Sequence, residues 1–117
     1  MQVLKKNHAF SHVIRRGKRL HGRTMTIYYR KRQDALPSKF GVTCTRGIGI
    51  AVERNRLKRQ LREICRAFMP QLPDGHDFVF MAKPNAKSST YQVMKSEAEQ
   101  LLQQASLIRE GDRSSVC

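Results

Sequence analysis

The clearest hydrophobic pattern in the chain lies in residues 53–66, with the sequence "ERNRLKRQLREICR". Its apolar side chains recur at helical spacing and fall within about 100° of arc, the width of a core-facing stripe. Pro70 and the "PDG" at 73–75 end the pattern, because proline cannot continue a helix. The sequence therefore predicts an amphipathic helix with one buried side. That side consists of Leu57, Leu61, Ile64, Cys65 and Phe68.

Three further segments have the composition of strands. In the first, Met25 and Ile27 alternate with Thr26 and Tyr28, which predicts one buried face. The third is apolar on both faces, so we expect it to lie in the centre of the sheet. The segments are 24–32 ("TMTIYYRKR"), 39–46 ("KFGVTCTR") and 76–84 ("HDFVFMAKP").

Two more amphipathic segments predict the remaining helices. Residues 7–17 have an asparagine cap, a glycine stop and an apolar side that includes Phe10 and Ile14. A last helix is expected over about 90–105, where apolar residues again recur at helical spacing. The segment 15–23, "RRGKRLHGR", has two glycines and five Lys or Arg and is expected to be a basic loop.

The element order α-β-β-α-β-α predicts a single-domain α+β fold, an α/β sandwich with a small mixed sheet and about three helices. Two strands that flank a helix form a βαβ unit, so at least one pair of strands is expected to be parallel. One layer of helices on one sheet suits a chain of 117 residues. We expect the domain to span 1–106 and the tail, 107–117, to be disordered.

Charge then points to the kind of partner. The net charge is +14, and residues 1–69 hold 18 of the 23 Lys and Arg but only 3 of the 9 acids. A polyanion, either nucleic acid or an anionic membrane surface, is the natural counterpart of such a surface. No stretch approaches the roughly 20 apolar residues that span a bilayer, and the N-terminus lacks an apolar region of signal-peptide length. The chain is therefore expected to be cytoplasmic.

The exposed side of the helix predicted over 53–66 is a line of positive charge. Lys58, Arg62 and Arg66 follow one another at i,i+4 beside the buried stripe, and Asn55 and Arg59 continue the arc. Arg54 lies at the edge of this arc. Arg56 lies on the far flank near Glu63, where a structural role is an alternative.

Two interpretations of this basic side compete: a merely solvated face, and a surface that binds nucleic acid. Arg outnumbers Lys five to one between 53 and 66, and its planar guanidinium matches phosphate and base edges. The basic segments 15–23 and 30–32 add charge of the same sign, which favours nucleic acid. A basic helix that reads DNA as a bZIP dimer needs a zipper after it, and Pro70 leaves no room for one. RNA, recognised by shape, backbone and stacking, fits better, and we expect no DNA or membrane partner.

The residues that could carry chemistry give no protein active site. Three cysteines without a CxxC pair predict reduced, structural thiols. His8 and His12 lie at i,i+4, but no third metal ligand has diagnostic spacing, so we expect solvated or phosphate-contacting imidazoles and no protein-bound metal. Three acids in residues 1–69 cannot build the carboxylate cluster of a two-metal nuclease. Any cleavage chemistry is expected to lie outside this chain.

At "ERNRLKRQLRE" the sequence resembles the RNR signature of the bacterial ribonuclease P protein subunit. "LKKNHAFSHVIRRG" is similar to the first helix of that family, and "KFGVTCTRGIGIAV" is similar to the strand and turn that precede its signature. "DFVFMAKP" resembles the strand that follows. The resemblance runs from about Leu4 to Leu102, with the order and spacing of these motifs preserved.

This resemblance implies a left-handed βαβ crossover through the RNR helix, which opposes the usual right-handed rule. It implies a protein that assists a catalytic RNA in the endonucleolytic removal of the 5′ leader from precursor tRNA. The magnesium ions would be held by the RNA and the substrate. A structural RNA-binding protein, such as a ribosome-assembly factor, and a self-sufficient nuclease are the alternatives.

The resemblance also implies two sets of site residues. The RNR helix would face the catalytic RNA, and a cleft between the first helix and the sheet would take the single-stranded leader. For Phe10 the alternative is simple packing of helix on sheet, and for Tyr28 it is a surface position in a strand. Ile14 and Gly47 depart from the family pattern, where an aromatic and a basic residue are common. The set for the catalytic RNA is Arg46, Arg54, Asn55, Arg56, Lys58, Arg59 and Arg62, and the set for the leader is Lys6, Asn7, Phe10, Ile14, Arg15 and Tyr28.

Overall fold

The computed structural model describes residues 2–3, 7–45 and 48–108. The predicted helices and strands are all present, and their ends lie within about two residues of the expected ones. The elements are β1 (Gln2–Val3), α1 (Asn7–Arg16), β2 (Lys18–His21), β3 (Met25–Lys31), β4 (Lys39–Cys44), α2 (Ala51–Phe68), the 3-10 turn η1 (Met69–Gln71), β5 (His76–Ala82), the 3-10 turn η2 (Pro84–Ser88) and α3 (Tyr91–Gln104).

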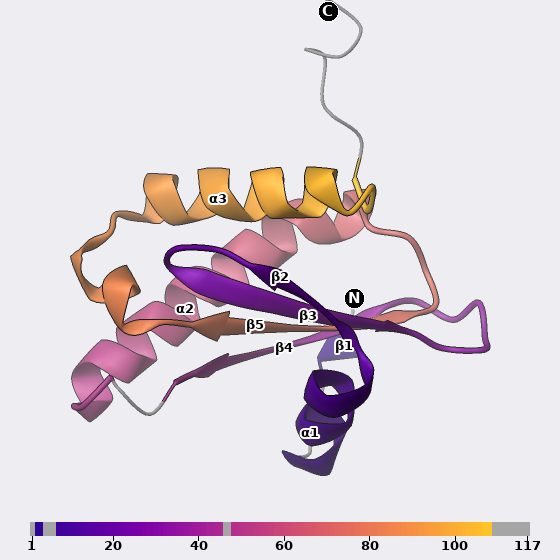
Figure 1. The fold of residues 1–117 in the computed structure, drawn as a ribbon, viewed down its shortest axis with the longest axis horizontal. Helices are drawn as coiled ribbons and strands as arrows, with labels where there is room; N and C mark the ends of the chain where they lie inside the picture. The colour runs from indigo at the N-terminus through magenta and orange to yellow at the C-terminus, as the bar shows by residue number, and fades with distance from the viewer. Residues whose placement is uncertain (1, 4–6, 46–47, 109–117) are drawn as a thin grey trace, which may run out of the picture.

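The strands form one mixed sheet in the order β1-β4-β5-β3-β2 (Figure 1). Strand β5 lies in the centre, parallel to β4 and antiparallel to β3, which confirms the position predicted for the strand that is apolar on both faces. Helix α2 joins the two parallel neighbours β4 and β5. This crossover has the left-handed sense that the family resemblance implied.

The basic segment expected to be a loop contains a strand instead. Strand β2 pairs antiparallel with β3 and forms one edge of the sheet, with Leu20 opposite Ile27. Of its four residues only Leu20 is partly buried, so the alternation that marks a half-buried strand is too short to detect. The two-residue strand β1 was also missed, because it exists only through its pairing with β4. The predicted elements occur in the predicted order, and β1 and β2 are additional to them.

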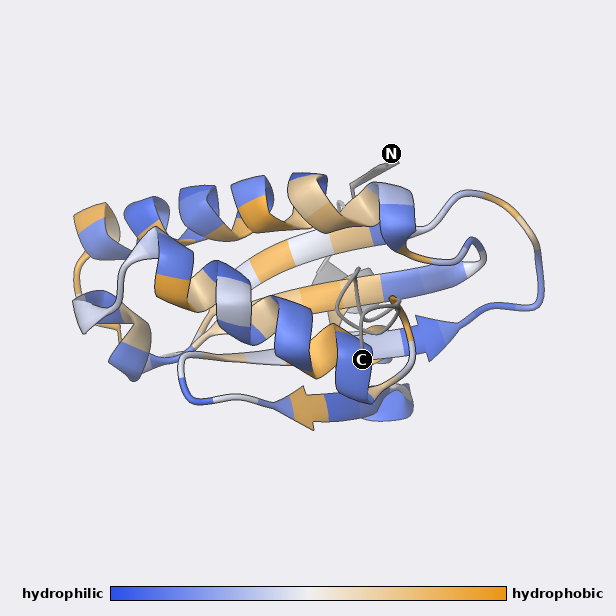
Figure 2. Ribbon diagram, turned by 90° about the horizontal axis from the view of Figure 1, so that it is seen from above, coloured by the Kyte–Doolittle hydropathy of each residue, from blue (hydrophilic) through white to orange (hydrophobic). Residues whose placement is uncertain are grey.

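Helices cover both faces of the sheet, so the expected single layer of helices is wrong. Helices α2 and α3 lie on one face, and α1 packs on the other (Figure 1). Alternation along β3 explains why both faces need cover: Met25 and Ile27 belong to the core under α2 and α3, whereas Tyr28 packs under α1. Seen from the α2 and α3 side, the hydrophobic colour is concentrated in the middle of the sheet, and the turns of the two helices that face the viewer are mostly hydrophilic (Figure 2).

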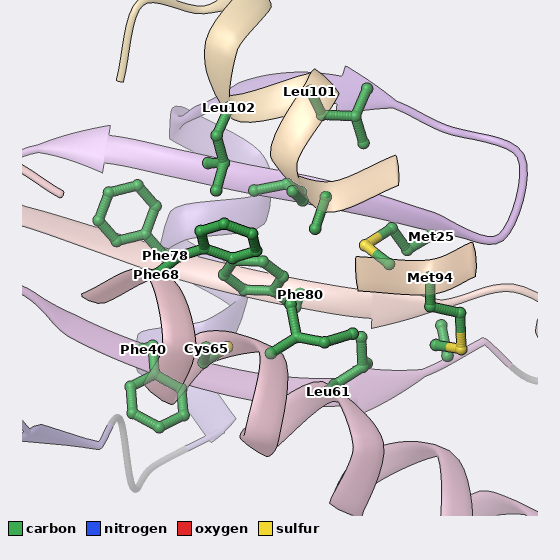
Figure 3. Packing of buried hydrophobic residues seen from close by; sticks show 14 of the residues in the cluster. Met25, Phe40, Leu61, Cys65, Phe68, Phe78, Phe80, Met94, Leu101 and Leu102 are labelled. Carbon is green, nitrogen blue, oxygen red and sulfur yellow. The ribbon is translucent and has the colours of Figure 1, made fainter. Parts of the chain in front are cut away.

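The main core lies between the sheet and the pair α2 and α3. Phe40, Phe78 and Phe80 point into it from adjacent strands, and Leu61 and Cys65 meet them from α2 (Figure 3). All five residues of the predicted helix stripe are buried, as the hydrophobic pattern required. Burial of this stripe fixes the rotation of α2 and thereby decides which of its charged residues face outward.

The packed part of the chain extends beyond the domain end predicted at residue 106. Leu107 and Ile108 are 9% and 6% exposed and belong to the main core. They were assigned to a disordered tail because no periodic pattern includes them. The remaining tail, residues 109–117, lies outside the described residues.

Candidate RNA interface

The outward side of α2 carries a basic surface, here called the α2 ridge, formed by Asn55, Lys58, Arg59 and Arg62. Asn55, Arg59 and Arg62 are exposed and Lys58 is half-buried. Within the described part of the chain, none of these four side chains makes a hydrogen bond or an ion pair. The α2 ridge therefore presents donors and positive charge that have no partner among the described residues.

Two arginines expected to face RNA are used within the fold. Arg54 donates from Nη1 to the carbonyl oxygens of Gly49 (2.7 Å) and Ile48 (3.3 Å), which holds the chain that leads into α2. Arg56 pairs with Glu53 at 2.9 Å and donates to the carbonyl of Lys87 in η2 at 3.2 Å. The structural role weighed for Arg56 is present.

The carboxylate beside Arg56 is Glu53, and the expected neighbour Glu63 instead pairs with Arg66 at 2.9 Å. Arg54 lies on the flank of α2 that faces β4, because its backbone carbonyl accepts a hydrogen bond from the Cys44 thiol at 3.7 Å. Arg56 lies on the other flank, toward η2. Arg54 and Arg56 thus make their contacts on opposite flanks of α2, and the exposed Arg59 and Arg62 lie on the outward side between these flanks.

Ion pairing among the described residues leaves most of the positive charge uncompensated. The four ion pairs among the described residues use only Arg32, Arg56 and Arg66. Arg32 is a structural clamp: it binds Asp34 and Asp77 and donates to the carbonyls of Leu36 and Pro37. The hydrogen bonds that Arg32 donates to Asp34 raise the pKa of the Arg32 guanidinium, and the same contact lowers the pKa of Asp34.

A second candidate surface lies where α1 packs on the sheet, here called the α1 junction. Val13, Tyr28 and Val79 are buried at its centre, and Phe10, Ile14 and Met81 pack around them and stay partly exposed. The ring of Phe10 lies against Gly41 of β4. Tyr28 is only 8% exposed, so it is a packing residue under α1 and not the surface position weighed for it.

The register across the sheet adds residues that the sequence did not indicate. Thr43, Met81, Thr26 and His21 are successive cross-strand neighbours on the face where α1 packs. This row lies next to the row through Gly41, Val79, Tyr28 and Arg19, which α1 partly covers. Alternation within each strand could have assigned the faces, but only the strand order brings these residues into one line.

Comparison with known proteins identifies the family. The sequence model described as Ribonuclease P matches residues 1–106. A ribonuclease P protein component from Pelotomaculum thermopropionicum is 36% identical over 93% of this chain and 96% of its own length. One from Syntrophomonas wolfei is 37% identical over 84% of this chain and 82% of its own length. The chain belongs to the ribonuclease P protein family.

The fold agrees with this assignment. The solved structure of the Staphylococcus aureus RNase P protein superposes with a TM-score of 0.81 over 93% of this chain and 99% of that one, at 23% identity. Membership in the ribonuclease P family makes this chain a protein component of an endoribonuclease complex that processes the 5′ ends of tRNA, as the sequence predicted. Among the described residues, no helix combines the length and apolar character needed to cross a membrane.

Several residues expected to matter in a ribonuclease P protein fall where the structure gives no detail. Lys6, Arg46 and Gly47 lie outside the described residues, and Asn7 begins α1 without a described side chain. Arg15 is exposed at the C-terminal end of α1. Among the side chains that the structure describes, residues 10–45 and 48–108, no group of three or more His, Cys, Asp or Glu could hold a metal ion.

Proposed function

We propose that this chain binds the catalytic RNA of ribonuclease P through the α2 ridge and the 5′ leader of precursor tRNA at the α1 junction. The observation that carries the proposal is the separation of charges: among the described residues the α2 ridge has no carboxylate partner, while Glu53 and Glu63 of the same helix pair with Arg56 and Arg66. Two polyanions, the catalytic RNA and the precursor, must approach each other during cleavage. A basic protein placed between them lowers their repulsion and fixes their relative position.

The α2 ridge fits a folded RNA better than a small anion. Its charges are spread along an 18-residue helix that is anchored by five buried residues. Each phosphate bound by a Lys or Arg releases counterions, so such a surface gives affinity that depends strongly on salt. The amide of Asn55 among these cations can pair with base edges or the ribose, which charge alone does not recognise.

The α1 junction fits an unpaired strand. Phe10 offers a partly exposed ring, and stacking of one base on an aromatic side chain contributes roughly 1–3 kcal/mol. Ile14 and Met81 beside it are apolar but not aromatic, so a second stacking platform is absent from these two positions. Single-stranded RNA is recognised through stacking and backbone contacts of this kind.

The chemistry is assigned to the RNA, with magnesium ions held by the RNA and the substrate. Four carboxylates of this chain are held in ion pairs: Asp34 and Asp77 bind Arg32, and Glu53 and Glu63 bind arginines of α2. Glu97 accepts hydrogen bonds from the turn before β3. In the reaction, this chain binds and orients the catalytic RNA and the precursor and reduces the repulsion between them.

Reconstitution tests the proposal. The chain is mixed with the catalytic RNA and a precursor tRNA at low magnesium, and cleavage is compared with that of the RNA alone. We expect faster cleavage with the protein and none by the protein alone. No improvement would contradict the assisting role, and cleavage by the isolated chain would contradict the assignment of the chemistry to the RNA.

A further inference from the structure

The sheet connects the α1 junction to a basic edge at β2. His21 pairs across the sheet with Thr26, and Thr26 pairs with Met81 at the junction. Arg19 likewise pairs with Tyr28. The distance from β4 to β2 is three strand spacings, roughly 14 Å. A strand of RNA that leaves the junction along this row therefore reaches the β2 edge.

The two faces of β2 differ in what they present. Arg19 and His21 lie on the face where α1 packs, because Arg19 is the cross-strand neighbour of Tyr28. Lys18 and Leu20 lie on the opposite face, where Leu20 packs against the main core. Arg19, His21 and Lys18 are all exposed, and their side chains have no hydrogen-bond or ion-pair partner among the described residues.

The turn after β2 is held in place by bonds to its backbone. The carboxylate of Glu97 accepts from the amide nitrogens of Arg23 (2.5 Å) and Thr24 (2.9 Å) and from the Thr24 hydroxyl. Lys83 donates from Nζ to the carbonyl of Gly22 at 2.6 Å, and Asn85 donates to the carbonyl of Arg23 at 3.3 Å. These bonds fix the turn and leave the exposed guanidinium of Arg23 unpaired among the described residues.

We propose that the leader of precursor tRNA, beyond the part held at the α1 junction, crosses the sheet to the β2 edge, where Arg19, His21 and Arg23 contact its backbone. This proposal rests on the proposed function and extends it to the part of the leader farther from the cleavage site. Because this cationic edge is already fixed, the protein loses little conformational freedom when a flexible strand of RNA binds to it. The other reading of the same residues is protection of an edge strand against pairing with another chain.

A pair of matched variants separates these readings. Arg19→Ala and Lys18→Ala remove the same charge from adjacent exposed positions on opposite faces of β2. Affinity for precursor tRNA is measured in the holoenzyme with leaders lengthened one nucleotide at a time. We expect Arg19→Ala to remove the gain in affinity that a long leader gives, and to flatten the salt dependence for that substrate by about 0.7 in log K against log salt. Lys18→Ala should leave both unchanged.

Each contrary outcome is informative. Equal effects of Arg19→Ala and Lys18→Ala, or an effect of Arg19→Ala that is the same for short and long leaders, would overturn the proposal. Self-association of Arg19→Ala with unchanged affinity for long leaders would show that the charge only protects the edge. Phe10→Ala should weaken the binding of precursor tRNA for every leader long enough to reach the junction. If Phe10→Ala has no such effect, the proposed function is contradicted, whereas the proposal for the β2 edge is tested by Arg19→Ala.

Discussion

The ring of Phe10 lies directly against the α-carbon of Gly41, so α1 approaches β4 at a position that has no side chain. A Cβ atom at Gly41 would overlap the Cζ and Cε1 atoms of that ring. The glycine is needed here for the close approach of a helix to a strand, since its φ is not in the left-handed region. This contact places the one aromatic residue of α1 at the edge of the α1 junction.

Gly41→Ala should therefore displace the ring of Phe10 and destabilise the domain. Overpacking a well-filled contact costs about 1–3 kcal/mol, and we expect the free energy of unfolding in urea to fall by that amount. Gly49→Ala is the control, because a Cβ atom at Gly49 would have no neighbour within 4 Å. Equal stability of Gly41→Ala and Gly49→Ala would mean that the Phe10 ring can move aside without a loss of packing.

Phe10→Ala should weaken binding of precursor tRNA more than binding of mature tRNA. The reason is that only the precursor has a leader to stack on the ring, and the loss should be roughly 1–3 kcal/mol. Binding of both RNAs by the reconstituted holoenzyme measures the difference. Equal losses on the two RNAs would mean that Phe10 only packs α1 on the sheet.

Arg59→Ala should weaken association with the catalytic RNA without affecting folding. Loss of one phosphate contact flattens the dependence of log K on log salt by about 0.7–0.9. The exposed Arg59 side chain has no partner among the described residues, so the free energy of unfolding should change by no more than about 0.5 kcal/mol. Filter binding over a series of salt concentrations and urea denaturation provide the two measurements.

Arg56→Ala should show the opposite balance. It removes an ion pair with Glu53 within α2 and the bond to the carbonyl of Lys87, which ties α2 to η2. Partly exposed contacts of this kind contribute about 1 kcal/mol or less, so a small loss of stability is expected, with a smaller effect on RNA binding than that of Arg59→Ala. A loss of RNA affinity equal to that of Arg59→Ala, with unchanged stability, would return Arg56 to the RNA-binding set.

The two described thiols should differ in their reactivity. Burial raises the pKa of Cys65 well above its ordinary value, and it raises the pKa of Cys44 against the opposing effect of Lys58 and Arg54. Because the thiolate is the reactive form, a raised pKa lowers reactivity at neutral pH. In a Cys117→Ser background, iodoacetamide should label Cys44 slowly, faster as the pH rises, and leave Cys65 unlabelled until urea is added. Native labelling of Cys65 at the denatured rate would contradict its burial.

Local pattern was enough to predict the helices and the three longer strands. The stripe from Leu57 to Phe68 was readable because a helix places residues three and four apart on one side, and all its members are buried. The central place of β5 followed from its apolar residues on both faces. The family could be identified from the sequence for a related reason, since its signature lies within one continuous helix and the strand before it.

Tertiary structure alone decided what depends on pairing and packing between distant segments. Strand β2 exists because it pairs with β3, and a single inward residue, Leu20, gave no local signal. Leu107 and Ile108 join the core because the end of α3 brings them there.

The sequence by itself thus determined the elements, their buried sides and the excess of positive charge. The fold decided which charges stay open: it turned Arg54 and Arg56 toward carbonyls and a carboxylate, and it left Arg59 and Arg62 exposed. It also aligned Met81 with His21 through two strand pairings. Side-chain direction follows from local geometry, whereas contact between strands depends on a register that no single segment encodes.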